Sequence, residues 1–317
     1  MINCYKPEGA LFGTKDNRDH ISSRAGLERA MNEGKILEAT ALLCDSRMRL
    51  HVDLYGMTGI IEKSEAVYSP DNKDIKDIAV ITRVGKPVCF KVLGFTSEDG
   101  REVAILSRRE AQKECLGQYL CDLIPGDIVE ARVTHLDSFG AFVDIGCGIV
   151  SLLSIDCISV SRISHPSDRL SVGDRIYTVI KSIDRDNGRI FVSMRELLGT
   201  WLENAAEFEV GQTVAGIVRS IESYGVFVEL TPNLAGLAEI RDGTVDSDIA
   251  KAGERVAVYI KSILPDRMKI KLVLIDSYNG STPPPKLRYY TDCQAVCHID
   301  RWQYSPDGAS KIIESVF

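Results

Sequence analysis

The chain has 317 residues, of which 44% are hydrophobic and 26% are charged, and its formal net charge is −7. This acidic balance argues against a protein that coats nucleic acid by charge alone, but it leaves room for a local binding surface. Because no apolar run could span a bilayer, no secretory signal begins the chain, and the nine cysteines form no CxxC pair, we expect a cytoplasmic protein with reduced thiols and no membrane segment.

The first predicted element is a helix over 21–33, which Gly34 ends. Beyond it, short segments rich in Val and Ile alternate apolar and polar residues between Gly, Asp and Asn turns, and this period of two predicts β-strands.

The strand pattern recurs along the chain. GDIVEARV (126–133) matches GQTVAGIV (211–218), and VGDRIYTVIKSI (172–183) matches AGERVAVYIKSI (252–263). A weaker copy lies upstream, so the chain contains three repeats. The predicted domains are an N-terminal segment over 1–33, repeats over 34–106, 126–194 and 211–275, linker helices over 107–125 and 195–210, and a tail over 276–317.

In the middle repeat we expect five short strands, near 127–136, 139–146, 149–155, 175–183 and 188–193. The turn DRDNGR (184–189) is a hairpin signal between the last two. Five strands this short cannot cover both faces of an open sheet, so we expect each repeat to close into a small barrel that removes the sheet edges.

The linkers and the tail carry their own signals. SRRE (107–110) and SMRE (193–196) are Ser-x-x-Glu capping boxes that each follow a strand and predict the two linker helices. The tail begins at the stiff TPPP (282–285) and is too aromatic for a disordered end. It either packs onto the third barrel or forms a small interaction module.

One motif, SFGAFVDIG (138–146), returns as SYGVFVELT (223–231). Strand alternation places Ala141, Val143 and Ile145 in the core of the middle repeat, so that Phe142 and Asp144 face solvent. The same count in the third repeat turns Phe227 and Glu229 outward.

Phe139 lies three positions before Phe142, and strict alternation would place the two on opposite faces. A bulge or bend at Gly140 brings both rings to one surface. The alternative is that one ring fills the barrel while the other covers its rim. Because Tyr224 and Phe227 repeat the arrangement, we favour two flat rings side by side, which form a stacking platform for unpaired bases.

These residues resemble a known domain. The segments 126–146, 172–174 and 183–193 are similar to the RNA-binding domain named after bacterial ribosomal protein S1, over the whole middle repeat, most of the third and the first only loosely. The resemblance implies an all-β chain: three tandem five-stranded barrels of the oligonucleotide/oligosaccharide-binding (OB) type, joined by short linker helices and followed by the aromatic tail. As a whole, the chain is similar to short bacterial S1-like proteins of three to four repeats.

The resemblance also implies site residues. In the middle repeat the two aromatic places fall on Phe139 and Phe142, the aspartate place on Asp184 and the arginine place on Arg189. The family histidine is replaced by Ser154, so its ring and charge are lost there.

In the third repeat the aromatic places hold Tyr224 and Phe227, and the basic place holds Lys269. Glu239 stands at the histidine place and Leu264 at the aspartate place. An acidic residue on the binding face should weaken this copy, so we rank it second.

The first repeat has Met48 and His51 at the aromatic places and Glu62 at the histidine place. We expect it to bind RNA poorly. The resemblance implies that such a leading repeat docks onto protein instead, with the small ribosomal subunit as the partner.

Other side chains have open roles. Arg132 and His135 lie on the first strand of the middle repeat and are candidates for RNA contact, although Arg132 could instead pair with Glu130. The basic loop SRISHPSDR (161–169) either contacts phosphates or is an ordinary solvated loop.

No catalytic or metal site is expected. Cys293, Cys297 and His298 lack a fourth ligand at a zinc spacing, and no nucleophile stands beside a base in a recognisable motif. The sequence therefore predicts a non-enzymatic protein without a cofactor.

The predicted function is binding of single-stranded RNA, namely mRNA, in translation. Two alternatives stay open. One is a regulator of transcription or RNA decay built on the same domain. The other is a protein-interaction scaffold, which the acidic charge together with Glu62 and Glu239 favours.

Overall fold

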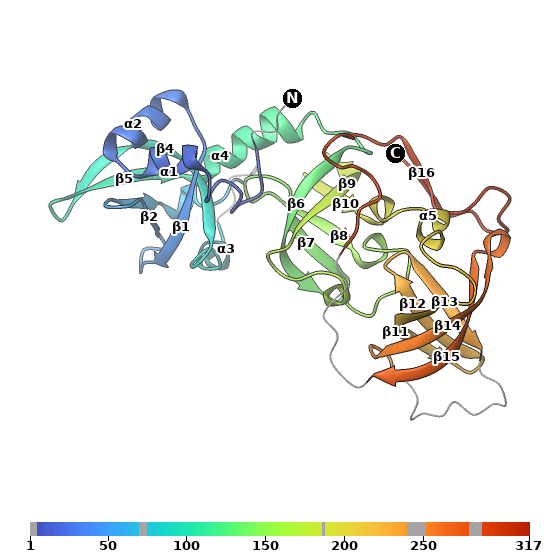
Figure 1. Ribbon diagram of the computed structural model, residues 1–317. Coiled ribbons are helices and arrows are strands. Elements are labelled where there is room, and N and C mark those ends of the chain that lie inside the picture. Colours follow the sequence, from blue (N-terminus) through green and yellow to red (C-terminus); the bar gives the residue numbers. More distant parts are fainter. Residues whose placement is uncertain (1–4, 70–74, 186–187, 240–250, 279–286) are drawn as a thin grey trace. The chain divides into compact units, whose positions relative to one another are not determined.

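The computed structural model describes residues 5–69, 75–185, 188–239, 251–278 and 287–317 (Figure 1). Residues 186–187 of the expected turn over 184–189 and the TPPP spacer lie outside these residues. The chain divides into two compact units, which we describe separately. The first comprises residues 1–123, 130–132 and 144–150, and the second comprises the rest.

The strands form three closed five-stranded barrels and one two-stranded sheet within the described residues. The first barrel contains β1 (Leu37–Cys44), β2 (Leu50–Asp53), β3 (Thr58–Ile61), β4 (Pro87–Glu98) and β5 (Arg101–Ser107). The middle barrel contains β6 (Ile128–Asp137), β7 (Gly140–Asp144), β8 (Val150–Ser154), β9 (Arg175–Asp184) and β10 (Arg189–Ser193). The third barrel contains β11 (Thr213–Glu222), β12 (Gly225–Thr231), β13 (Leu234–Glu239), β14 (Arg255–Leu264) and β15 (Lys269–Tyr278).

All three barrels share one topology. In the first barrel the order is β1-β2-β3-β5-β4, and β4 pairs back onto β1. The third strand of each barrel runs parallel to the fifth, as β3 does with β5, β8 with β10 and β13 with β15. This Greek-key order in a small barrel is the OB arrangement. The prediction of an all-β chain built on OB-like barrels is therefore confirmed.

The helices are short: α1 (Lys15–Ile21), α2 (Arg24–Glu33), α3 (Asp77–Ile81), α4 (Arg108–Cys115) and α5 (Trp201–Ala205). As expected, Gly34 ends α2, with a left-handed φ of 65° that favours glycine. However, this helix begins at Arg24, three residues later than predicted, because Ile21 ends the preceding helix α1 and Ser23 caps α2.

Only one of the two predicted capping boxes starts an α-helix. The Ser107 hydroxyl accepts the Glu110 N–H at the start of α4. The prediction at SMRE was wrong, since the Ser193 hydroxyl instead contacts the Glu196 carboxylate and no helix is capped there. Instead α5 begins at Trp201, where Thr200 and Glu203 form a reciprocal capping box.

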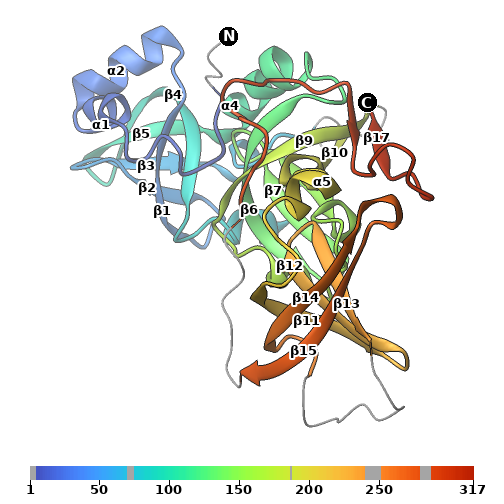
Figure 2. The same cartoon turned by 45° about the vertical axis from the view of Figure 1, so that its right-hand side comes forward.

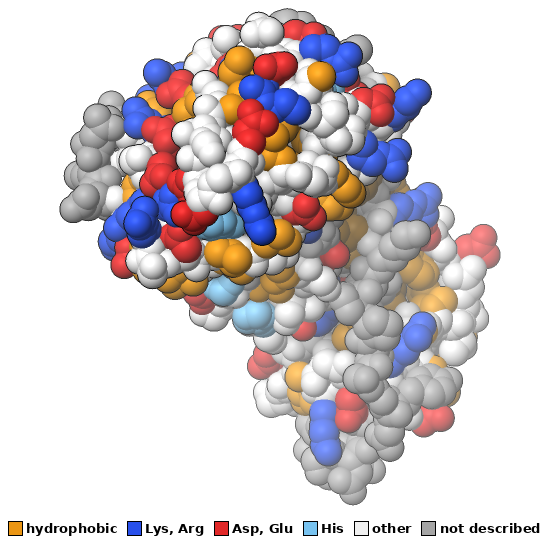
Figure 3. Space-filling view, turned by 90° about the vertical axis from the view of Figure 1, so that its left-hand side faces the viewer, with side chains coloured by type: hydrophobic (Ala, Val, Ile, Leu, Met, Phe, Trp, Pro, Cys, Tyr) orange, Lys and Arg blue, Asp and Glu red, His pale blue; other side chains and the backbone are white. Residues whose placement is uncertain are grey.

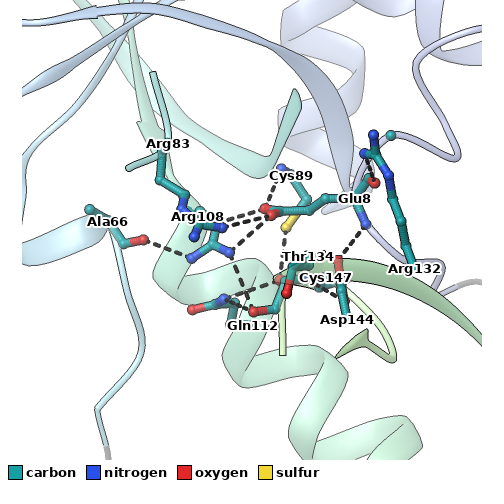
Figure 4. A network of polar contacts seen from close by, with 12 residues as sticks. Glu8, Ala66, Arg83, Cys89, Arg108, Gln112, Arg132, Thr134, Asp144 and Cys147 are labelled. Carbon is teal, nitrogen blue, oxygen red and sulfur yellow. Dashed lines mark hydrogen bonds and ion pairs between the residues drawn. The ribbon is translucent and has the colours of Figure 1, made fainter. Parts of the chain in front are cut away.

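In the first unit, an N-terminal segment is held by buried charges (Figure 4). Glu8 and Arg108 form an ion pair with 2.6 Å between Oε1 and Nε, and the side chain of each is almost fully buried. The Glu8 N–H donates to Asp144 Oδ2 at 2.7 Å. Asp144 also accepts the N–H groups of Gly146 and Gly148. A buried ion pair of this kind is costly to break from one side, so it ties the segment firmly to α4.

Asp144 therefore does not face solvent as predicted. Its side chain points away from the barrel core, but only 1% of the residue is exposed, because the N-terminal segment covers it. Burial, followed by the nearby charge of Glu8, raises the pKa of Asp144 to about 7.

A second carboxylate, Glu38, holds the next residues of the same segment. Its Oε2 accepts the N–H groups of Gly9, Leu11 and Phe12 at 3.1, 2.9 and 3.0 Å. The other oxygen, Oε1, is buried with no hydrogen-bond partner among the described residues. Burial therefore outweighs the three N–H bonds and raises the pKa of Glu38 to about 7.

In the second unit, the tail packs back onto the third barrel, which is the first of the two alternatives above. β16 (Arg301–Gln303) pairs with β17 (Glu314–Val316), and Trp302 and Tyr304 join the hydrophobic core of that barrel. On the way, the tail runs along the middle barrel, where the Tyr289 hydroxyl accepts the Tyr177 N–H (Figure 2).

Glu229 also differs from the prediction of an exposed residue. Only 3% of it is accessible, because Arg169 contacts its carboxylate and Arg219 Nε lies 2.7 Å from Oε2. Arg169 comes from the basic loop of the middle repeat and is itself buried. This arginine therefore neither faces solvent nor reaches a phosphate; it joins the loop to the third barrel.

The start of β7 depends on a close approach between strands. A Cβ atom at Gly140 would lie 2.5 Å from the Leu153 carbonyl oxygen on β8. Gly225 occupies the same place in the third barrel, 2.7 Å from the Ala238 oxygen. The glycine is thus required by the spacing of β7 and β8 rather than by the bulge that we expected.

We expect Gly140→Ala to lower the free energy of unfolding by roughly 1–3 kcal/mol, because the added methyl overlaps a strand backbone that cannot move aside. Urea denaturation followed by circular dichroism measures this. Gly117→Ala is the control, since its Cβ would meet nothing within 4 Å. Equal stability of the two variants would show that the strands can separate at Gly140.

We also expect stability to fall between about pH 4 and pH 7. The folded state binds the Glu38 proton up to about pH 7, whereas an unfolded glutamate releases it near pH 4.3, so deprotonation favours unfolding in this window. Glu38→Gln should reduce this slope, with Asp144 supplying the remainder. Denaturation at several pH values tests this, with the exposed Glu28→Gln as control; an unchanged slope in Glu38→Gln would contradict it.

Candidate nucleic-acid interface

The two phenylalanine rings of the middle barrel lie together on its outer surface. Phe139 is 51% exposed and Phe142 is half-buried, whereas Ala141 and Val143 are fully buried. The predicted strand phase is therefore confirmed. Phe139 escapes the alternation because it lies in the turn before β7 rather than in the strand.

The rings are not flat side by side, as we expected. Their centroids are 5.9 Å apart with an interplanar angle of 89°, which is an edge-to-face pair. His135 on β6 adds a third ring, 6.1 Å from Phe142 and tilted from it by only 26°. The rings of His135 and Phe142 are thus nearly parallel, and the ring of Phe139 is perpendicular to that of Phe142.

The third barrel repeats this geometry. Tyr224 is 59% exposed and Phe227 half-buried, with centroids 6.1 Å apart and an angle of 88°. The same residue spacing on the same turn and strand has therefore produced the same ring pair twice.

Glu239 at the histidine place is paired with a cation. It lies opposite Gly225 across β12 and β13, and Lys271 Nζ is 2.8 Å from its Oε1. Lys271 was not predicted as a partner of Glu239, because the two residues are far apart in the chain. The parallel pairing of β13 with β15 brings them together.

The predicted charged residues lie at the ends of the β9–β10 and β14–β15 hairpins. Arg189 pairs with Asp184, and Lys269 pairs with Leu264 at the matching register. Both basic side chains are exposed. Arg132 lies in the first unit, where its Nη1 donates to the Glu8 carbonyl oxygen at 2.7 Å. Its expected alternative partner, Glu130, contacts Lys6 at 2.9 Å.

The first barrel carries a charged network where the others carry rings. Met48 lies in the β1–β2 turn with a φ of 61°, and His51 Nε2 is 3.1 Å from Asp45 Oδ2. Arg49 contacts both Asp45 and Glu98, at 2.9 and 2.8 Å. Partial burial alone would raise the pKa of Asp45, but hydrogen bonds from Arg49 and His51 lower it below its usual range.

Beside this network is a hollow of about 920 Å³. Its lining is largely polar and includes His51, Asp53, Thr58, Glu98, Asp99 and Arg101. Over this part of the chain, acidic and basic side chains are interspersed instead of gathered by sign (Figure 3). Among the described residues the first barrel thus carries no ring pair, and the face in Figure 3 gathers no basic patch.

His298, one of the three residues considered as metal ligands, contacts a carboxylate of the middle barrel. His298 Nδ1 lies 2.8 Å from Asp127 Oδ1, in the segment where the tail runs along the middle barrel. In the described part of the chain, no group of three or more His, Cys, Asp or Glu residues could hold a metal ion. The helices of this part are also too short or too polar to cross a membrane.

Comparison with known proteins places these features in context. Residues 122–195 match the model of the S1 RNA binding domain. The chain is 32% identical over 275 residues to small ribosomal subunit protein bS1 of Staphylococcus aureus, covering 83% of this chain and 67% of that one. It is 33% identical over 178 residues to bS1 of Leuconostoc lactis, covering 53% of this chain but only 41% of that protein.

A solved structure from Streptococcus pneumoniae, a multidomain protein with nucleic acid binding domains, is 16% identical and aligns over 76% of this chain and 73% of that one. Its TM-score of 0.24 is too low to indicate a shared arrangement of domains.

The ring pairs should contribute little to folding. We expect Phe139→Ala to lower the free energy of unfolding by less than about 1 kcal/mol, because the ring is largely in water. Val143→Ala, one strand position beyond Phe142 but in the core, should cost about 2 kcal/mol. Urea denaturation compares the two, and a larger loss for Phe139→Ala would mean that the ring belongs to the core.

Proposed function

Because this chain belongs to the bacterial family of small ribosomal subunit protein bS1, we propose that it binds single-stranded RNA, including mRNA, and acts in translation. Bases stack on the rings of Phe139 and Phe142 and on those of Tyr224 and Phe227. The single observation that carries the proposal is that exposed edge-to-face ring pairs recur at matching places on two barrels.

The geometry suits unpaired bases. Each base that stacks on an aromatic side chain contributes about 1–3 kcal/mol, with little dependence on its identity. In an edge-to-face pair the rings cannot both lie under one base, so the proposal assigns them to different bases. His135, nearly parallel to Phe142, extends the surface of the middle barrel.

Charge plays a secondary part in the proposal. Exposed Arg189 and Lys269 neutralise phosphates at the hairpin ends, and Asp184 opposite Arg189 accepts a hydrogen bond from a ribose hydroxyl. Arg132, with one N–H already bound to a backbone oxygen, contributes at most its remaining donors. We rank the third barrel second, because Glu239 occupies Lys271 and places a negative charge beside the rings.

We assign a different task to the first barrel. Its network of Asp45, Arg49 and Glu98 stands where the other barrels carry ring pairs, which supports contact with protein in preference to RNA. The proposed partner is the small ribosomal subunit, by analogy with the named relatives. The three barrels then act as tandem S1 repeats of a cytoplasmic, non-enzymatic protein, with α4 and α5 as parts of the linkers and the tail as a strap on the third barrel.

Phe142→Ala should weaken binding of a labelled single-stranded RNA about tenfold, since one stacking position is lost. Fluorescence anisotropy at several salt concentrations measures this. The slope of log K against log salt should lie between about −0.7 and −2, because only one to three phosphates are neutralised.

Phe12→Ala serves as a control, because this phenylalanine is exposed but belongs to no ring pair within the described residues. A much steeper salt slope would mean that charge dominates. Unchanged affinity in Phe142→Ala, with the fold intact by circular dichroism, would overturn the proposal of stacking.

A further inference from the structure

A row of outward side chains crosses the middle barrel beyond its ring pair. β8 lies between β7 and β10, and Phe191 on β10 is directly opposite Leu152 on β8. The Ser151 hydroxyl donates to the Ile190 carbonyl oxygen at 2.6 Å and ties the two strands at this register.

Phe191 faces away from the barrel core. Its neighbours Ile190 and Val192 are buried, as is Leu153 on the adjacent strand, whereas Phe191 and Leu152 are only half-buried. Phe191 is therefore half-buried and points outward from the barrel, as Phe142 does. The sequence analysis overlooked it because it lies outside the repeated motif.

The third barrel has a corresponding row of side chains. There Phe227 is opposite Leu237, and Leu237 is opposite Lys271 on β15. Lys271 stands two residues after Lys269, as Phe191 stands two residues after Arg189. The place that holds a cation in the third barrel thus holds an aromatic ring in the middle one.

The spacing also fits a continued surface. β7 and β10 are two strand spacings apart, or about 10 Å, and the aliphatic Leu152 lies on the strand between them. An apolar strip from the Phe139–Phe142 pair over Leu152 to Phe191 contains no charged side chain that would hold a base away from the last ring.

We propose that Phe191 is a further stacking position of the middle barrel, which takes an additional unpaired base of a bound single-stranded RNA. This inference rests on the proposed function and extends it. It also makes the two barrels differ in kind. At this place the middle barrel binds by stacking, which salt hardly affects, while the third barrel carries Lys271, which is paired with Glu239 and whose contact with a phosphate would weaken with salt.

The test uses the full chain and a short labelled oligouridylate, with anisotropy titrations at several salt concentrations. Phe191→Leu keeps apolar cover on the barrel but removes the flat ring, and we expect it to weaken binding about tenfold without changing the salt slope. Phe191→Lys copies the third barrel, and its slope should become steeper by about 0.7, as expected for one additional phosphate. Circular dichroism melting confirms that each variant is folded.

Phe142→Ala is measured in parallel. If Phe142→Ala weakens binding and Phe191→Leu binds like the unmodified chain, Phe191 only covers the barrel: the inference fails and the proposed function stands. If neither substitution weakens binding, stacking on this barrel fails altogether. Weaker binding by both Phe142→Ala and Phe191→Leu, with a steeper salt slope for Phe191→Lys, supports a stacking surface that extends over three strands.

Discussion

A five-stranded barrel of this size can bury only every second side chain of each strand, and the side chains between them must face outward. The ring pairs and the charged network that distinguish the barrels lie on outward strand positions or in the adjoining turns. The inward set is much the same in all three barrels: small and branched apolar residues such as Ala141 and Val143 that fill the narrow interior.

The outward side chains fall into two groups. Some are covered by another part of the chain: Asp144 lies under the N-terminal segment, and the Glu229 carboxylate accepts hydrogen bonds from Arg169 and Arg219. Others stay in contact with water, among them Arg189 and Lys269 at the hairpin ends and, in part, the rings of the second strands. Asp144 and Glu229 thus fasten segments to a barrel, while the ring pairs stay accessible.

The same outward surface also distinguishes the three barrels from one another. The middle and third barrels carry ring pairs, whereas the first carries a network of ion pairs among Asp45, Arg49 and Glu98. Charges that already satisfy one another have less to gain from a phosphate, whereas a ring in an edge-to-face pair can keep its neighbour while a base stacks on its exposed face. Affinity for RNA is therefore expected to decline with the loss of rings rather than with the loss of positive charge.

Strand positions, the inward phase and the ring motif were all predictable from the sequence, because they depend on alternation within a few neighbouring residues. The edge-to-face angle of the rings, the burial of Asp144 and Glu229, and the placement of Lys271 and Phe191 were not. The burial of Asp144 and Glu229 and the placement of Lys271 and Phe191 arise from residues distant in the chain: a segment that folds back over β7, a loop that carries Arg169, and parallel strand pairs whose register no local pattern encodes. The alternation of apolar and polar residues in the sequence determined which side chains point outward. Only the tertiary structure decided which of them remain in contact with water, because covering a charged group requires a partner that the neighbouring sequence does not contain.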